Sequence, residues 1–313
     1  MLALLTTLAL AQDTPEWRGA LGAQVDADPH GIVDLGWRQG PWSVEILTDT
    51  VDARWSPAWE RGRGWLGLRG QGYAGQMLIS PWEDGAPAPE RALVGLYVGV
   101  DGGAVTYLPA GLYVGAAGAV RLWGFGRRGA ASTAPVPAPR PVGSAEAIVG
   151  WWRESAELAI RAGADISPLG LAPRVWSRIE LRPPWVVAPW VLAHGIAAEG
   201  QDDLLTARVG GLNPYVIPVA GAAWAEWWVE DVAALRGGPR LQGELGSLAV
   251  VGDVAWFERS TVAGLGIVSR WTPPPWFVEL SVGYAPWIPR QANVGRSSLF
   301  VLIGRSWAPR LDE

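Results

Sequence analysis

Short segments in which apolar side chains alternate with small or polar ones recur along almost the whole chain. In residues 276–285, the even positions carry Trp, Val, Leu, Val and Tyr, while the odd positions carry Phe, Glu, Ser, Gly and Ala. Successive side chains of a β-strand point to opposite faces, so this segment has one apolar, aromatic-ended face and one mostly small or polar face. The wall of a transmembrane β-barrel requires this pattern, because lipid lies outside it and water inside. The sequence therefore predicts an all-β fold, a transmembrane antiparallel β-barrel.

Composition agrees with a membrane wall. Charged residues make up 18% of the 313 residues, against about 25% in soluble domains. The chain has 21 Trp but only 6 Tyr and 4 Phe, and the Trp residues recur singly, often near segment ends. They would supply the aromatic girdles at the two membrane surfaces. The alternative is a secreted, soluble, Trp-rich β protein such as a propeller, which predicts repeats of about 40 residues; the chain shows no such period.

Transmembrane helices are a second alternative. Residues 102–120 and 209–225 are uncharged, and the first segment approaches the length of a spanning helix. However, the first contains Pro109 and the second Pro214 and Pro218, and proline and glycine break helices. Strand alternation explains both segments better.

The alternating segments set the size of the barrel. A mature chain of about 300 residues gives roughly 19 residues to each strand of about ten residues together with its connection, so the chain accommodates about 16 strands, with a range of roughly 14–18. Candidate strands cover residues 17–26, 31–38, 42–50, 51–55, 65–72, 73–80, 93–101, 104–108, 112–125, 147–153, 156–166, 175–182, 185–198, 204–210, 220–230, 248–257, 262–271, 276–285 and 298–307. Several of these candidates are short or weak.

The remaining segments complete a single-domain organisation. Residues 1–11 resemble a short signal peptide without its basic start, and the small residues at positions 9 and 11 predict cleavage before Gln12; the alternative is an ordinary first strand or helix. Residues 12–313 form one barrel domain. Residues 127–144 are rich in proline, which predicts a long outer loop. The expected location is the bacterial outer membrane, with its lipid as the surrounding partner.

The last strand ends as a barrel-closing strand would. Leu299, Val301 and Ile303 occupy alternate positions that lead to Trp307, and Gly304 follows Ile303. The string Ile-Gly-Arg-Ser-Trp at 303–307 resembles the end of the bacterial surface antigen family, the barrel superfamily of outer-membrane assembly and two-partner-secretion proteins. This resemblance implies recognition of the C-terminal strand by the barrel-assembly machinery.

Upstream segments keep the order of that family over residues 204–307. Residues 251–254, 262–268 and 276–284 resemble its Asp-containing, Gly-x-Gly and penultimate strands. The resemblance also implies that residues 209–219 fold into the lumen as a plug or constriction. Its expected members are Arg208, Gly210, Gly211, Asn213, Pro214 and Tyr215.

The chain departs from the family at two places. The loop tip is Asn-Pro-Tyr, without the family's lumen-anchoring arginine; Arg208 could replace it, with Glu226 and Asp253 as acidic partners on nearby strands. The periplasmic POTRA repeats, which bind clients in the family, are missing from the sequence. We therefore expect a pore, a transport element or an assembly accessory rather than a full insertase. A general diffusion porin unrelated to the family is the alternative.

Enzymatic and ligand-binding chemistry finds little support. The chain has no Cys, and His30 and His194 stand far apart without a nucleophile at a telling spacing. This counts against a barrel lipase or protease and against a metal site. Two G-x-G-x-x-G strings, at 70–75 and 124–129, lack a following helix. We expect no cofactor, and the net charge of −5 argues against nucleic acid as a partner.

Charged residues on the strands should face the lumen. A charge on the lipid face costs about 2–4 kcal/mol at the membrane midplane. Mixed charges in a lumen form ion-pair networks or set ion selectivity. Residues expected to share inward faces are Glu157, Arg161 and Asp165 on one strand and Arg174, Arg178, Glu180 and Arg182 on the next.

Overall fold

The computed structural model describes most of the chain. The described residues are 15–27, 29–48, 50–72, 78–79, 82–83, 85–127, 132–202, 204–212, 217–223, 226–257, 260–273, 275–291 and 294–305.

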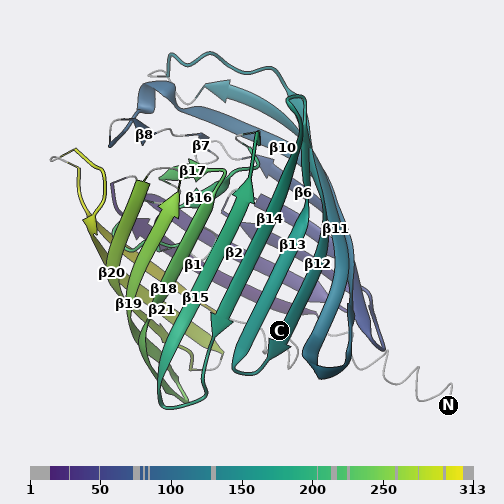
Figure 1. Cartoon of the computed structure of the whole chain (residues 1–313), viewed down its shortest axis with the longest axis vertical. Helices are drawn as coiled ribbons and strands as arrows, with labels where there is room; N and C mark the ends of the chain where they lie inside the picture. The colour runs from purple at the N-terminus through teal and green to yellow at the C-terminus, as the bar shows by residue number, and fades with distance from the viewer. Residues whose placement is uncertain are drawn as a thin grey trace.

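Sixteen antiparallel strands of the described chain form a closed barrel, which confirms the predicted fold and strand number (Figure 1). Each strand pairs with the next one along the barrel wall, and the last pairs with the first. The wall strands are β1 (Glu16–Val25), β2 (His30–Gln39), β3 (Trp42–Leu47), β4 (Thr50–Trp55), β6 (Gly62–Gly72), β10 (Leu93–Tyr107), β11 (Leu112–Arg127), β12 (Arg140–Arg153), β13 (Ala156–Ser167), β14 (Gly170–Leu181), β15 (Val187–Ala198), β18 (Val232–Gly243), β19 (Gly246–Phe257), β20 (Ser260–Trp271), β21 (Trp276–Trp287) and β22 (Ser297–Arg305).

Short elements lie between the wall strands. They are the strands β5 (Ala58–Trp59), β7 (Leu78–Ile79), β8 (Trp82–Glu83), β9 (Ala86–Pro87), β16 (Ala207–Val209) and β17 (Trp227–Val229), and the single-turn 3-10 helices η1 (Pro89–Arg91) and η2 (Pro109–Gly111). In the described part of the chain, no helix has the length and hydrophobicity to cross a membrane.

The barrel closes through β22, the strand predicted to do so. Its register with β1 runs from Gly19 opposite Arg305 to Val25 opposite Leu299. Val301 and Ile303 share the outward parity with Leu299, while Phe300 and Leu302 point inward and are buried. Side chains therefore alternate regularly along β22, which has two apolar faces, one toward lipid and one toward the lumen. Trp307 lies outside the described residues.

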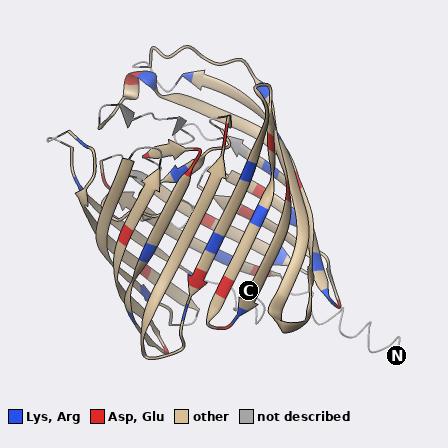
Figure 2. Ribbon diagram, viewed as in Figure 1, with Lys and Arg blue, Asp and Glu red and all other residues tan. Residues whose placement is uncertain are grey.

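The outer surface of the wall is apolar and the inner surface carries the charges. Leu68, in the middle of β6, is 63% exposed and points outward, whereas Arg69 next to it pairs with Asp52 inside the barrel. Exposed tryptophans gather at strand ends, as Trp17 and Trp276 do. Figure 2 shows charged residues along the strands, well away from the turns. Such an outer surface is compatible with hydrocarbon only if those charges face inward.

The Pro-rich loop is shorter than the predicted 127–144. Strand β11 continues to Arg127 and β12 already begins at Arg140, so Pro141 stands inside a strand. Pro141 pairs with Leu122 of β11, but β12 pairs with β13 only from Gly143 onward. The missing N–H of Pro141 therefore leaves no gap in the ladder, because that edge of the strand is still unpaired there.

Two other predicted boundaries differ from the structure. Residues 93–101 and 104–107 belong to one strand, β10, in which Gly103 leaves room for the ring of Trp65; Leu108 lies just beyond it. Residues 204–210 and 220–230, predicted as strands, contribute only the short pair β16 and β17, which is not part of the wall. The described residues of these two segments lie in the lumen.

Candidate functional site in the lumen

Between β15 and β18, the described residues of 199–231 fold back into the barrel; we call these residues the lumen segment. Its strands β16 and β17 pair with each other and lie within the ring of wall strands in Figure 1. Val209, Val219 and Ala222 are fully buried and pack with wall residues such as Val262 and Ala285. The lumen segment therefore forms a dry layer against one side of the wall.

The lumen segment touches the wall backbone where the wall has glycine. A Cβ atom added at Gly264 of β20 would lie 2.1 Å from the carbonyl oxygen of Ala220, and one at Gly283 of β21 would lie 2.5 Å from the amide nitrogen of Gly221. Gly221 itself has φ +83°, a left-handed conformation that favours glycine. The close crossing of residues 219–223 over the wall thus depends on three glycines.

Three wall side chains hold backbone amides of the lumen segment. Asp253 of β19 accepts the N–H of Ala220 (2.7 Å), Ser298 of β22 accepts that of Gly221 (2.9 Å), and Gln24 of β1 accepts that of Leu212 (3.2 Å). These three wall residues are buried. Since buried amides need acceptors, these bonds fix the position of the segment as well as stabilise it.

Asp253 also anchors an arginine. It accepts two hydrogen bonds from Arg236 of β18, 2.6 Å from Nε and 2.7 Å from Nη2. The two residues face each other in the β18–β19 register. Such a bidentate pair is geometrically specific, so Asp253 is held rigidly where the lumen segment crosses the wall.

A second buried ion pair joins the lumen segment to the mouth of the barrel. Glu226 is bound by Arg290, which lies between β21 and β22; the side chains are 1% and 0% exposed. The Nε of Arg290 is 3.0 Å from Oε1 of Glu226, and Ala223 donates its N–H to the same carboxylate (2.9 Å). Burial raises the pKa of Glu226, against the opposing effect of Arg290. Next to Arg290, the N–H of Gln291 donates to the carbonyl of Gly85 (3.1 Å) on the opposite side of the mouth.

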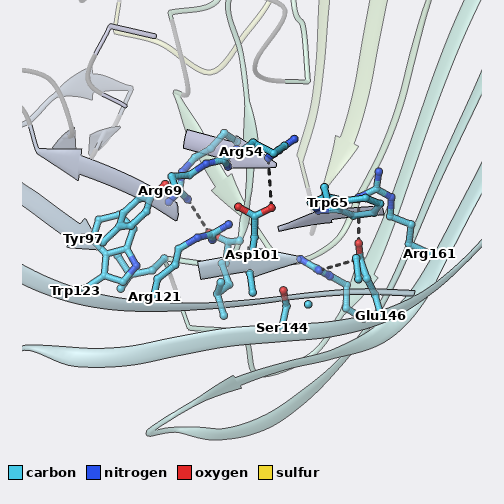
Figure 3. A pocket seen from close by; sticks show the side chains of 18 residues that line it. Arg54, Trp65, Arg69, Tyr97, Asp101, Arg121, Trp123, Ser144, Glu146 and Arg161 are labelled. Carbon is cyan, nitrogen blue, oxygen red and sulfur yellow. Dashed lines mark hydrogen bonds and ion pairs between the residues drawn. The ribbon is translucent and has the colours of Figure 1, made fainter. Parts of the chain in front are cut away.

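The other half of the lumen is a polar cavity of about 570 Å³ (Figure 3). Its wall consists of β4, β6 and β10–β14, and residues 204–208 of the lumen segment form its remaining side. Six arginines but only two carboxylates line it: Arg54, Arg69, Arg121, Arg161, Arg174 and Arg208, with Asp101 and Glu146. The lumen is thus divided into a dry half and a charged half.

Ion pairs cross-link much of the charged half. Glu146 binds both Arg161 (3.1 Å) and Arg174 (3.2 Å), while Asp101 binds Arg54 (3.3 Å). The charges predicted to share inward faces on β13 and β14 do pair. Further down the barrel, the pairs are Arg178 with Glu157 (3.2 Å) and Glu180 (2.6 Å), and Arg182 with the same two carboxylates (3.8 and 3.5 Å).

The residues predicted for the lumen loop are placed as follows. Gly210 and Gly211 adopt positive φ angles of +118° and +93° at a turn within the lumen segment. The guanidinium of Arg208 lies 3.1 Å from the ring centroid of Trp228. Asn213, Pro214 and Tyr215 fall outside the described residues.

Glu226 and Asp253 both bind arginines: Arg290 pairs with Glu226 and Arg236 pairs with Asp253. A role for Arg208 as their partner stays a prediction. The sequence analysis also missed Gln24 and Ser298 as anchors. A recognisable signal existed for the crossing point: glycines on the inward faces of two neighbouring strands, at 264 and 283.

No family model matches the chain, and no curated protein matches it. Among solved structures, CdiB from Acinetobacter baumannii superposes with a TM-score of 0.69 at 11% identity, covering 94% of this chain and 60% of that one. BamA from Haemophilus ducreyi, lacking POTRA domains 1-3, gives 0.64 at 9% identity (94% and 70%), and CdiB from Escherichia coli gives 0.63 at 10% (93% and 63%).

The fold is that of the BamA and CdiB barrels. The resemblance seen in the last third of the sequence therefore extends, at the level of fold, to the whole barrel. The chain spans about 60% to 70% of the length of these structures.

Proposed function

We propose that the chain is a channel of the bacterial outer membrane, without enzymatic activity, whose lumen is shared between a resident plug and a water-filled passage. The lumen segment is the plug, and the passage follows the polar cavity along β4, β6 and β10–β14. The apolar outer surface and the barrel fold support the membrane location.

The observation that carries this proposal is the unequal filling of the lumen. The lumen segment is hydrogen-bonded and packed against β18–β22 and β1, where its amides find Asp253, Ser298 and Gln24. Its other side borders a cavity of about 570 Å³ lined mainly by charged side chains. Charged walls retain water, so this half of the barrel offers a hydrated route for small solutes.

Planar-bilayer conductance tests the channel. We expect the full chain to give a small, steady conductance that increases several-fold when residues 210–218 are deleted, because the deletion removes plug residues such as Leu212 and Ile217 and leaves every wall strand intact. Deletion of residues 135–138, in the Pro-rich loop between β11 and β12, is the control and should leave the conductance unchanged. Absence of conductance from both the full chain and the 210–218 deletion would refute the proposal.

An assembly accessory is the second candidate, favoured by one observation. The lumen segment is bonded to both strands of the closing seam, through Gln24 of β1 and Ser298 of β22, so its position is coupled to the seam. The chain has no Cys, so a cysteine pair at Leu21 and Ile303, which face each other on the outer side of the seam, can lock it selectively. A channel should conduct equally well oxidised and reduced. An assembly factor should lose its stimulation of barrel insertion into vesicles on oxidation and regain it on reduction.

A further inference from the structure

Two neighbouring side chains of β11 give the polar cavity a specific binding geometry. Arg121 and Trp123 are two residues apart on one strand, so they share its lumen face, and both line the cavity. Figure 3 places them side by side with Tyr97 of β10 at one end of the cavity.

Trp123 presents a buried donor that has no acceptor among the described residues. Its side chain is 4% exposed, and its Nε1–H makes no hydrogen bond to the described part of the chain. The indole N–H can only donate, and a buried donor left unpaired is costly. An acceptor oxygen from a solute in the cavity would satisfy it.

The wall fixes the position of that donor. The Trp123 ring lies 4.6 Å from that of Tyr97 and is stacked on Phe125 at 6.2 Å, measured between ring centroids. Gly95 of β10 leaves room for it, because a Cβ atom there would lie 2.7 Å from the Trp123 ring. The indole ring is therefore held in place by its neighbours, and a solute reaches the covered Nε1 only when the side chains over it shift.

Arg121 supplies the charge beside the donor. Its guanidinium lies 5.4 Å from the centroid of the Tyr97 ring, and Gly99 makes room for its side chain, since a Cβ there would lie 2.8 Å from its Cγ. Arg54 and Arg161, in the same cavity, are paired with carboxylates. A cation held over an aromatic face keeps the edge of its guanidinium fork available for an oxyanion.

The charge balance of the cavity favours an anion. Its six arginines exceed its two carboxylates. Even when Asp52 and Asp165 are added, because they pair with Arg69 and Arg174 at the edge of the cavity, six positive charges face four negative ones. A positively charged cleft with low-dielectric walls concentrates anions.

We propose that the cavity binds a small oxyanion, the phosphate or carboxylate group of a solute, through the guanidinium of Arg121 and the indole N–H of Trp123. In the proposed channel, the site also makes the passage prefer anions over cations. This selectivity rests on the proposed function, whereas the binding of the oxyanion does not.

Calorimetric titration of the detergent-solubilised full chain tests the binding without requiring conductance. We expect saturable binding of inorganic phosphate, and of acetate more weakly, with no saturable signal from chloride. Trp123→Phe removes the N–H but keeps the ring, and Arg121→Gln removes the charge. Because a hydrogen bond to a charged group is strong, each variant should weaken phosphate binding roughly tenfold or more. Heat-modifiable gel migration would verify that each variant is folded.

Arg270→Gln is the matched control. Arg270 also lies over an aromatic ring, 5.7 Å from the centroid of Phe277, but it does not line the cavity. Its removal should leave phosphate binding unchanged. Absence of phosphate binding by the unmodified chain, or equal losses in Arg121→Gln and Arg270→Gln, would overturn the site.

Reversal potentials in a potassium chloride gradient separate this inference from the channel proposal. Anion preference that decreases in Arg121→Gln supports both. Conductance without anion preference or phosphate binding refutes the oxyanion site and leaves the channel. Phosphate binding without conductance refutes the channel and leaves the site.

Discussion

Replacing Asp253 by alanine should have two effects: it should release the lumen segment, and it should destabilise the barrel. The carboxylate is 1% exposed and accepts three hydrogen bonds, two from Arg236 and one from the N–H of Ala220. Asp253→Ala leaves a buried guanidinium without its counter-charge and a buried amide without its acceptor. Both groups then lie in a part of the lumen packed with apolar side chains.

The size of the loss follows from these contacts. Breaking a buried ion pair by removing one partner costs about 3–5 kcal/mol. A buried amide left without its acceptor costs about 1–3 kcal/mol. This cost does not add in full to the cost of the broken ion pair, because the lumen segment can move so that the amide meets water. We therefore expect Asp253→Ala to lower the free energy of unfolding by about 3–5 kcal/mol. Asp253→Asn keeps an acceptor oxygen and should lose less.

The free energies of unfolding of these variants are measured by urea unfolding in lipid vesicles. Heat-modifiable gel migration reports the folded fraction, and linear extrapolation to zero urea gives the free energy. Glu16→Gln is the control: Glu16 is 40% exposed at the rim, where it pairs with Arg38, and such a pair is worth at most about 1 kcal/mol. A second variant carrying Arg236→Met with Asp253→Ala should recover part of the loss, because no unpaired charge remains. If Asp253→Ala costs no more than Glu16→Gln, the anchoring of the lumen segment by Asp253 is wrong.

Two further predictions concern the inner and outer faces of the wall. Gly264→Ala puts a Cβ 2.1 Å from the carbonyl oxygen of Ala220, so the lumen segment must move away and conductance should rise; Gly124→Ala, with nothing within 4 Å of its added Cβ, is the control, and equal conductance of the two variants would contradict the close crossing. Leu68→Arg places a charge on the lipid face and should lower the free energy of unfolding in vesicles by about 2–4 kcal/mol; an unchanged value would mean that Leu68 does not face lipid.

The barrel could be predicted from the sequence because one side of every wall strand must suit hydrocarbon. Alternation in residues 276–285 identified β21 and its outward face, and the same reasoning gave β22 as the closing strand. Alternation alone was ambiguous for residues 204–210 and 220–230. A segment that lies on the inside of the wall also has one apolar and one polar side, so its pattern imitates that of a wall strand.

The acidic anchors could be predicted only in part. Glu226 and Asp253 are carboxylates in an apolar stretch, which marks them as paired, but their partners depend on three-dimensional placement. Arg236 faces Asp253 because of the register between β18 and β19, and Arg290 reaches Glu226 from a loop 64 residues away. Local sequence carries neither the register nor the path of that loop, so the partners Arg236 and Arg290 could not be identified from it.

The position of the polar cavity follows from the kinds of side chain that the wall presents. On β18–β21, inward positions at the crossing are small, such as Ala234, Ala255, Gly264 and Gly283, so a chain segment can lie against the wall and bury its backbone there. On β4, β6 and β10–β14, inward positions carry long charged side chains, which are costly to strip of water. If the lumen segment settled on that side, it would desolvate several arginines and gain few close contacts. The side chains of the wall therefore determine on which side of the lumen the lumen segment packs and on which side the polar cavity remains.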